Sequence, residues 1–283
     1  MSLRLRLMTP ADLPFADSLR ALAGWNQTIE DWQRLLANEP KGCFLAEWSG
    51  APVGTATTTV YAPNLAWIGM VLVHPTYRRR GIGRTLVERC IDHLRVRGVR
   101  CIKLDATPTG KQIYDALGFK DEWTLIRWVC HFTPPQSMAP EGIRNWRTTD
   151  AQEVESFDTA AFGASRTRLL PVLAQQSRCV LVLQSPSGVE AYGLLRPGSQ
   201  ALYLGPVAAR SADTGLRLLE TLAGRSEGQR MFLDIPDQND AAVAWAKARG
   251  CKAQRPLTRM FLGDNLASGD PRRQFALAGP EIG

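Results

Sequence analysis

The stretch from Ala66 to Leu94 constrains the fold of this chain more than any other. Ala66–Val73 is a run without a polar residue, which predicts a strand covered on both faces. Pro75 ends that strand, because proline cannot donate a hydrogen bond to a sheet. Apolar residues then recur at helical spacing from Ile82 to Leu94. The sequence therefore predicts a central strand, a turn and an amphipathic helix.

The turn between this strand and this helix is basic and contains two glycines. It reads Arg78-Arg79-Arg80-Gly81-Ile82-Gly83. The first amides of a helix lack partners within the helix and lie at the positive end of its dipole, so such a junction can bind phosphate oxygens. Glycines allow the backbone to approach a ligand closely and to take up positive φ angles. The spacing matches neither a Gly-x-x-x-x-Gly-Lys-Ser/Thr loop nor a dinucleotide fingerprint with three glycines.

This stretch resembles the GNAT superfamily of acetyl-CoA-dependent N-acetyltransferases. Their motif is Arg/Gln-x-x-Gly-x-Gly/Ala after a strand that ends in Val-x-Pro, and this chain has Val73-His74-Pro75 before its Arg-x-x-Gly-x-Gly. The resemblance implies an α+β fold, with a mixed α/β-type sheet flanked by helices, and acetyl-CoA as cofactor. The residues that it implies for cofactor binding are Val71, Leu72, Val73, Arg78, Arg79, Arg80, Gly81, Ile82, Gly83, Arg84, Thr109, Gly110 and Tyr114. The alternative is a basic surface turn that begins an ordinary helix.

Tyr114 is the candidate catalytic residue. It lies on a predicted short helix that ends in Leu117-Gly118-Phe119, and the resemblance implies that a tyrosine at this position faces the cofactor sulfur. A phenol of pKa ~10 can protonate a thiolate of pKa ~8.5 when orientation and environment assist, so Tyr114 could act as general acid. The alternative is an aromatic core residue.

The sequence defines less well the side of the fold where the amine that accepts the acetyl group would bind, here called the acceptor side. The resemblance places the first two predicted helices over this side, so that Trp25 and Asn26 could contact substrate, although core packing and loop capping are equally consistent. No general base is evident. Asp105 at a strand end, Glu30 or Asp31, a base acting through water, and no base at all remain open. Gly69 predicts either a bulge or a close packing contact.

The domain organisation follows from length and from an internal repeat. A chain of 283 residues predicts two domains. Leu104-Asp105 recurs as Leu233-Asp234, and Gly118 recurs as Gly250, which indicates a duplication. Residues 134–142 read as a linker, so the resemblance implies an acetyl-CoA-binding GNAT domain at 1–133 and a degenerate GNAT-like domain at 143–283. The strand predicted at Trp123–Phe132 should complete the first sheet. In the second half Asp213 stands where the first half has Gly81, so we predict that this half does not bind acetyl-CoA in the usual manner.

Composition narrows the classes of partner and location that remain. The net charge of +7 fits an anionic cofactor better than nucleic acid, because no DNA-binding helix pattern is present. No apolar run reaches the ~20 residues that span a bilayer, so no membrane partner and a cytoplasmic location are expected. We also expect no metal site. The six cysteines form no Cys-x-x-Cys pair, which predicts reduced packing residues.

The resemblance implies an N-acetyltransferase that moves an acetyl group from acetyl-CoA to a primary amine by direct attack on the thioester. The acceptor, a small molecule or a protein amine, and the oligomeric state are not predicted. Two alternatives stay open. One is an acyl-CoA sensor or scaffold without catalysis, and the other is a basic nucleic-acid-binding protein.

Overall fold

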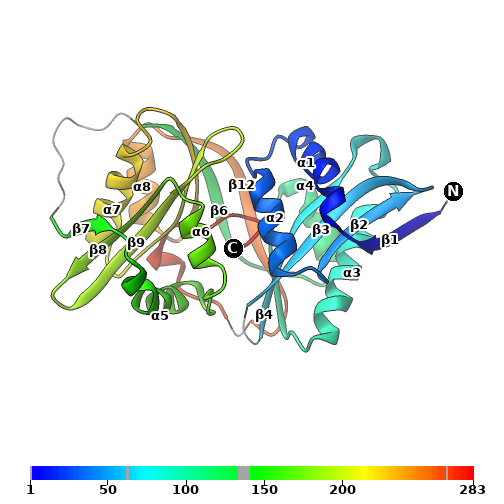
Figure 1. Cartoon of the computed structure of the whole chain (residues 1–283), viewed down its shortest axis with the longest axis horizontal. Coiled ribbons are helices and arrows are strands. Elements are labelled where there is room, and N and C mark those ends of the chain that lie inside the picture. Colours follow the sequence, from blue (N-terminus) through cyan, green and yellow to red (C-terminus); the bar gives the residue numbers. More distant parts are fainter. Residues whose placement is uncertain (1, 62–63, 133–140, 266) are drawn as a thin grey trace. The chain divides into compact units, whose positions relative to one another are not determined.

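The computed structural model describes residues 2–61, 64–132, 141–265 and 267–283. The chain divides into two compact units (Figure 1). Unit 1 consists of Met1–Asp121, Met260–Leu266 and Pro280–Gly283. Unit 2 consists of Glu122–Arg259 and Ala267–Gly279. The predicted linker at 134–142 lies mostly outside the described residues, which resume at Glu141.

Unit 1 contains a mixed sheet. In spatial order its strands are β1 (Leu3–Leu7), β2 (Cys43–Trp48), β3 (Ala51–Tyr61), β4 (Leu65–Val73), β5 (Cys101–Ala106) and the end of β12 (Lys252–Gly263). The pairs from β1 to β4 are antiparallel, and β4 pairs with β5 in parallel. β1 lies at the edge of the sheet.

The helices of unit 1 follow the predicted order. They are α1 (Leu13–Leu22), α2 (Ile29–Asn38), α3 (Ile82–Val96) and α4 (Pro108–Ala116). α3 contributes one apolar face to the core, where it meets Ala66 and Ile68 of β4 and Ile102 and Leu104 of β5. Because strand residues alternate between faces, Trp67 and Gly69 point to the other side of β4. The strand, turn and helix predicted between Ala66 and Leu94 are confirmed by β4 and α3.

Unit 2 repeats this architecture. Its strands run in the spatial order β12, β6 (Lys120–His131, in this unit from Glu122), β11 (Arg230–Pro236), β10 (Leu202–Ala209), β9 (Gly188–Arg196), β8 (Cys179–Ser185) and β7 (Ile143–Asn145), with β13 (Gln274–Ala276) beside β10. Its helices are α5 (Ala151–Phe162), α6 (Leu170–Gln175), α7 (Ala212–Gly224) and α8 (Asp240–Ala248).

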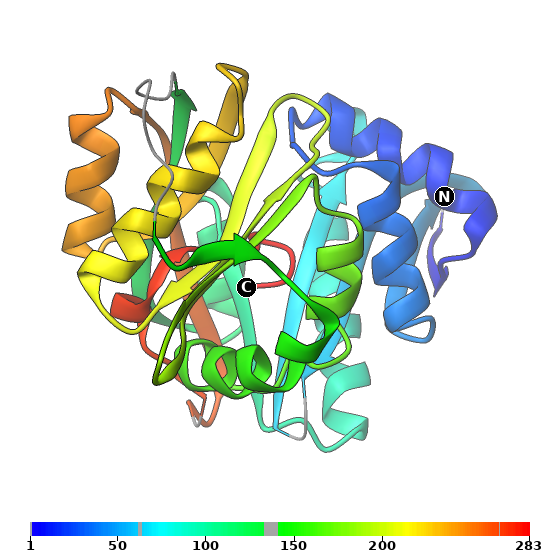
Figure 2. The same ribbon diagram turned by 60° about the vertical axis from the view of Figure 1, so that its left-hand side comes forward.

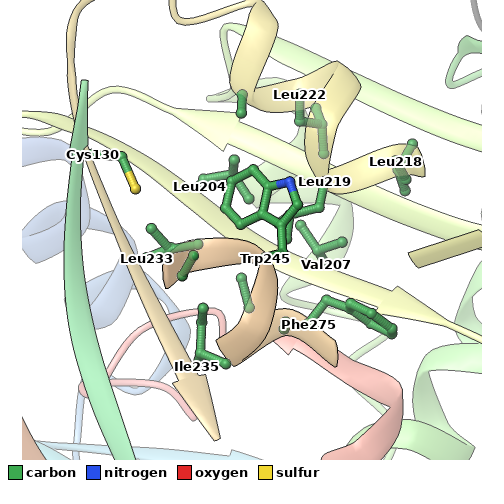
Figure 3. Close-up of a cluster of buried hydrophobic side chains, with 14 of the residues drawn as sticks. Cys130, Leu204, Val207, Leu218, Leu219, Leu222, Leu233, Ile235, Trp245 and Phe275 are labelled. Atoms are coloured by element: carbon green, nitrogen blue, oxygen red, sulfur yellow. The ribbon is translucent and has the colours of Figure 1, made fainter. Parts of the chain in front are cut away.

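Helices pack on both faces of the unit 2 sheet (Figure 2). Successive residues of β9 point to opposite faces and so show which helices lie on which face. Ala191 and Leu195 of β9 belong to the core that α7 and α8 cover. Tyr192, between them in the strand, instead meets Phe157 of α5 with ring centroids 6.2 Å apart. The α7 and α8 core centres on Trp245 and includes Phe275 (Figure 3).

The strand predicted to complete the first sheet pairs in unit 2 instead. β6 forms an antiparallel ladder with β11 from Leu125↔Pro236 to His131↔Arg230. Within this ladder the Arg127 guanidinium binds both carboxylate oxygens of Asp234, at 2.8 and 2.6 Å, and both side chains are almost fully buried. The period-two pattern of a strand shows which face is apolar but not which strand lies beside it. The sequence therefore identified the strand β6 but not its partner β11 or its place in unit 2.

The prediction that all six cysteines are reduced is wrong for two of them. Cys130 of β6 and Cys251, which precedes β12, form a disulfide with a Cα–Cα distance of 4.5 Å. Cys43, Cys90, Cys101 and Cys179 are free thiols. The two bonded cysteines are 121 residues apart, and a spacing this long carries no signal of pairing in one sequence.

Candidate active site

The N-terminus of α3 carries no side-chain cap. Its N-cap residue is Gly81, in a left-handed conformation with φ of 78°, and no side chain there accepts a hydrogen bond from the first amides. The first intrahelical bond runs from the Thr85 amide to the Gly81 carbonyl, at 3.0 Å. The amides from Ile82 to Arg84 thus have no partner within the helix and lie at the positive end of its dipole, as an anion-binding site requires.

The two glycines of this turn are glycine for different structural reasons. A β-carbon on Gly81 would meet no atom within 4 Å, so glycine is needed there for its positive φ. Gly83 has an ordinary helical backbone, and a β-carbon on it would lie 3.7 Å from Val73 and 3.9 Å from Ile113 of α4. The first turn of α3, the end of β4 and one face of α4 therefore lie within van der Waals reach of each other.

The arginines of the turn are exposed and held in different ways. Arg78 donates from Nε to the Val73 carbonyl at 3.1 Å. Arg80 lies over the rings of Trp48 and Tyr77, at 5.4 and 5.5 Å from their centroids. Arg84 pairs with Glu88 at 2.8 Å, and Arg79 takes a left-handed φ of 61°. The contact of Arg80 with Trp48 was not predicted, because Trp48 lies in a distant part of the sequence.

β4 opens away from β5 where the predicted cofactor residues begin. The parallel ladder runs from Leu65↔Cys101 to Trp67↔Lys103 and contains no later pair. On its other side β4 has a bulge, since the pairing moves from Thr57↔Gly69 to Thr55↔Leu72 and places two residues opposite one. The edge of Val71, Leu72 and Val73 that faces β5 thus has no ladder partner among the described pairs, and its backbone groups can bind a ligand.

Tyr114 lies on α4 beside the same apolar core. Its ring meets Phe119 edge-on with centroids 5.9 Å apart, and it packs against the core that contains α3. Burial among apolar atoms, followed by the Cys90 thiol, raises the pKa of Tyr114. The phenol is therefore protonated at neutral pH and can act as a proton donor.

The start of α4 places Tyr114. Thr107 caps the helix, and its Oγ1 accepts from the Gly110 amide at 3.2 Å. A β-carbon on Gly110 would lie 3.2 Å from the Tyr114 ring, which is tighter than an ordinary contact. Gly110 thus leaves room for the tyrosine, and its amide is already engaged. Cofactor contacts at Gly110 and at the exposed Thr109 stay predictions.

The candidates for the acceptor side lie in the loop between α1 and α2 and on β5. Asn26 is buried, and half-buried Trp25 accepts from Arg20 Nη1 through its carbonyl at 3.2 Å. By strand alternation Lys103 and Asp105 share the face of Trp67 and Gly69, opposite α3.

Sequence reasoning missed one acidic residue on this face. Glu281 is buried, and its Oε2 accepts from Gln27 Nε2 at 2.7 Å. Its main chain comes so close to Gly69 that a β-carbon there would lie 2.5 Å from the Glu281 carbonyl oxygen. Gly69 therefore both precedes the bulge and allows a close packing contact. A lone glutamate 254 residues from its partner gives no sequence signal.

The corresponding helix of unit 2 has a closed N-terminus. Ser211 caps α7 by accepting from the Thr214 amide at 3.2 Å, and Asp213 lies in the first turn. The ring of Phe275 covers Gly215 so closely that a β-carbon there would lie 2.3 Å from it. An anion at this end would meet a carboxylate and a satisfied cap instead of unpaired amides.

The opening between β10 and β11 is also filled in unit 2. The parallel ladder of these strands contains Leu202↔Met231 and Tyr203↔Phe232. Beyond it β13 pairs with β10 at Val207↔Ala276, and the Leu277 amide donates to the Asp234 carbonyl of β11 at 2.9 Å. The polypeptide itself occupies the place that stays open beside β4.

Within the residues that the structure describes, no three His, Cys, Asp or Glu side chains are grouped as a metal ion would require. No helix in the described part of the chain is both long and apolar enough to cross a bilayer.

Two family models match the chain in succession. One describes the acetyltransferase (GNAT) family and matches residues 12–119, and the other describes an acetyltransferase (GNAT) domain and matches residues 154–276. The chain is a tandem GNAT protein. Both halves of this tandem GNAT protein thus derive from the same fold, and it belongs to an acyltransferase family.

Relatives and solved structures agree with this assignment. YitH of Bacillus subtilis, an uncharacterized N-acetyltransferase, is 28% identical over 77% of this chain and 76% of its own length. Holothin acyltransferase of Pseudoalteromonas is 25% identical over 92% of this chain and 87% of its own. A Pyrococcus horikoshii crystal structure assigned as an acetyltransferase has a TM-score of 0.86 at 25% identity, covering 99% of this chain and 96% of that one. A tandem GNAT protein from the clavulanic acid pathway shares the fold, with a TM-score of 0.67 at 16% identity over 93% and 98% of the two chains.

Proposed function

We propose that unit 1 transfers an acetyl group from acetyl-CoA to a primary amine, whereas unit 2 binds no acyl-CoA in this manner. The observation that carries the proposal is the combination at α3 of an uncapped N-terminus and, next to it, the unpaired edge of β4. The uncapped helix N-terminus can bind a diphosphate. The unpaired strand edge can form hydrogen bonds with the amide groups of an extended pantetheine chain. Relatives named as N-acetyltransferase and as acyltransferase support acyl transfer in general.

Each part of unit 1 has a role in this proposal. The backbone amides around Ile82 and Gly83 bind the diphosphate, and the exposed arginines from Arg78 to Arg80 add positive charge. The backbone from Val71 to Val73 binds the donor along the open edge of β4. Acetyl-CoA supplies the thioester acetyl group and a thiolate as leaving group.

The chain itself supplies orientation and a proton. Holding donor and acceptor together can remove roughly 7–11 kcal/mol of barrier, so positioning is the main contribution. Tyr114 protonates the leaving sulfur, because its raised pKa keeps the phenol protonated. The amine nitrogen reaches the acetyl group from the face of β5 that carries Asp105, and Trp25 and Asn26 are proposed to contact the acceptor.

Thiol release tests this function. The purified chain is mixed with acetyl-CoA and with each member of a panel of primary amines, and free coenzyme A is measured. We expect release that depends on one class of amine. Acetyl-CoA binding without release for any amine would favour the sensor or scaffold, and no binding would contradict both.

Four further expectations stay predictions. The domain boundaries are proposed at 1–133 and 143–283, and β6 and β12 each contribute residues to both compact units. Acetyl-CoA rather than a longer acyl-CoA is proposed as donor. A cytoplasmic location and no nucleic-acid partner are likewise proposed.

A further inference from the structure

Two aromatic side chains lie beside the turn that precedes α3. Trp48 is the last residue of β2, and Tyr77 ends the short turn Pro75–Tyr77 that follows β4. Their ring centroids are 6.5 Å apart, and both side chains pack against the unit 1 core. The Tyr77 amide donates to the His74 carbonyl at 2.9 Å, which holds the turn in place. The two rings thus form a surface that is anchored at two separate points of unit 1.

The Arg80 side chain lies on this surface. Its guanidinium carbon is 5.4 Å from the centroid of the Trp48 ring and 5.5 Å from that of the Tyr77 ring. A cation within about 6 Å of a ring centroid is attracted by the face of the ring. Within the described part of the chain, exposed Arg80 makes no ion pair and no side-chain hydrogen bond. Its five N–H donors are therefore available to an anion from solution.

The other two arginines of the turn are placed differently. Arg78 donates from Nε to the Val73 carbonyl, so it lies against the end of β4. Arg79 is exposed and, in the part of the chain that the structure describes, contacts no aromatic ring. Three consecutive arginines thus include one that is directed to β4 and one that is directed to β2.

The order of the strands separates Arg80 from the open edge of β4. The strands run β2-β3-β4-β5, so β2 and β5 lie on opposite sides of β4. Because neighbouring strands are about 4.8 Å apart, the backbone of β2 lies roughly 10 Å from β4, on the side away from the open edge. In the proposed complex, pantetheine lies along that edge and the diphosphate lies at the start of α3. The diphosphate joins pantetheine to adenosine, so the adenosine can extend toward β2.

We propose that Arg80, positioned by Trp48 and Tyr77, binds the 3′-phosphate on the adenosine of acetyl-CoA. The inference rests on the proposed function of unit 1 and deepens it by naming the residues that select a donor with this phosphate. The amides at the start of α3 bind the diphosphate, and the 3′-phosphate is the other anionic group of the donor. A guanidinium can bind two phosphate oxygens side by side. Because the rings restrict the Arg80 side chain in advance, less of its freedom is lost on binding.

Calorimetry with two donors tests this inference. Acetyl-CoA and acetyl-dephospho-CoA differ only in the 3′-phosphate, and each is titrated into the full chain. We expect the wild type to bind acetyl-CoA about 10- to 100-fold more tightly, the range of a hydrogen bond between charged groups. Arg80→Gln should reduce this preference to about threefold or less, mainly by weakening acetyl-CoA.

A matched control separates this contact from a general effect of charge. Arg79→Gln removes the same charge from the adjacent residue, which has no aromatic contact in the described structure. It should weaken both donors by the same factor and leave the preference as in the wild type.

Variants of the rings test the positioning. Trp48→Leu should lower the preference for acetyl-CoA by about two- to fivefold, the scale of an exposed contact between a cation and a ring. Trp48→Phe keeps a ring face and should restore most of the preference. Tyr77→Leu removes the other ring and carries the same test if Trp48→Leu does not fold. Unchanged affinity for acetyl-dephospho-CoA shows that a variant has kept its fold.

Three results would overturn the inference. Equal losses for the two donors in Arg80→Gln would show that Arg80 binds the diphosphate or acts only through its charge. A preference of about threefold or less in the wild type would show that no residue binds the 3′-phosphate. An unchanged preference in the Leu variants of both rings would show that the rings do not position Arg80. If the wild type binds neither donor, the proposed function itself has failed.

Discussion

Gly81 and Gly83 illustrate how two residues of one motif can be glycine for different reasons. Gly81 needs its left-handed φ of 78°, whereas Gly83 has a helical backbone and space for a methyl group in the protein alone. Only the second position can therefore be changed without strain. The family motif, which allows alanine at this second position, has the same asymmetry.

Alanine substitutions at these two positions should change stability with opposite signs. Gly81→Ala should destabilise by about 1–2 kcal/mol, because an L-residue pays this cost in the left-handed region. Gly83→Ala should stabilise by about 0.5–1 kcal/mol, because alanine is the better helix residue. Free energies of unfolding from denaturant titrations measure both. Equal effects would show that the left-handed turn at Gly81 is absent in solution.

Tyr114→Phe tests the proton donor. Phenylalanine keeps the ring beside Phe119 and removes the hydroxyl, so acetyl-CoA affinity and stability should stay within about 0.5 kcal/mol of wild type. We expect kcat to fall by about 100-fold, the scale of one general acid. Because the pKa of Tyr114 is raised, kcat of the wild type should not decline below pH 10 through loss of this proton. An unchanged kcat in the variant would remove Tyr114 from the mechanism.

At the residue scale, the sequence predicted features that lie within short motifs, but it did not predict contacts between residues that are far apart in the chain. The basic glycine turn and Tyr114 lie within short motifs, and the structure places both around one core. Arg80 is held by an aromatic residue 32 positions earlier, and Glu281 meets an amide 254 positions earlier. Nothing in the local pattern of either residue encodes these partners.

At the scale of secondary-structure elements, an ion pair joins β1 to the turn that precedes α1. Arg6 of β1 donates to both oxygens of Asp12, which begins the turn into α1, at 2.7 Å each. These hydrogen bonds lower the pKa of Asp12 to about 2. The carboxylate therefore stabilises the fold above its unfolded pKa of ~3.9, and this contribution is lost as the pH falls through about 2.

Asp12→Asn should accordingly matter only where the carboxylate is charged. We expect a loss of about 1–2 kcal/mol at pH 7, reduced from the full shift because Arg6 is partly exposed. The difference from wild type should shrink between pH 4 and pH 2 and vanish below. Unfolding free energies across this range measure it, and a difference that is independent of pH would contradict the ion pair.

β6 shows the limit of sequence reasoning about elements. Its position was predicted, but its partner, β11, lies about 100 residues away and is selected by tertiary contacts such as Arg127–Asp234. Its disulfide from Cys130 to Cys251 was not foreseen either. Strand existence is a local property, whereas sheet membership is not.

Reduction of this disulfide should destabilise unit 2. The bond closes a loop of 121 residues, and removing such a constraint costs about 2–5 kcal/mol. Urea unfolding with and without dithiothreitol measures the loss, and Cys130→Ser should reproduce it. Cys179→Ser, which removes a half-buried free thiol, is the control and should have a much smaller effect. Identical unfolding curves in both conditions would mean that the bond does not form.

At the scale of the whole molecule, both units have the same fold, but only unit 1 keeps an uncapped helix beside an unpaired strand edge. Unit 1 keeps an uncapped helix and an open strand edge, whereas unit 2 caps α7 with Ser211 and fills the space between β10 and β11 with its own chain. Two family models of similar span thus describe halves with different capacities. The central claim is that the tandem chain binds one acyl-CoA, at α3.

Calorimetric titration with acetyl-CoA tests this claim most directly, using a matched pair of variants at the two N-cap positions. Gly81→Asp in α3 and Ser211→Asp in α7 each place a carboxylate at a helix start. Aspartate is a good N-cap residue in the extended conformation of Ser211, and it is one of the few residues that also adopt the left-handed conformation of Gly81. We predict one site per chain, abolished by Gly81→Asp and unchanged by Ser211→Asp. Two sites per chain, or binding that survives Gly81→Asp and is lost in Ser211→Asp, would contradict the account.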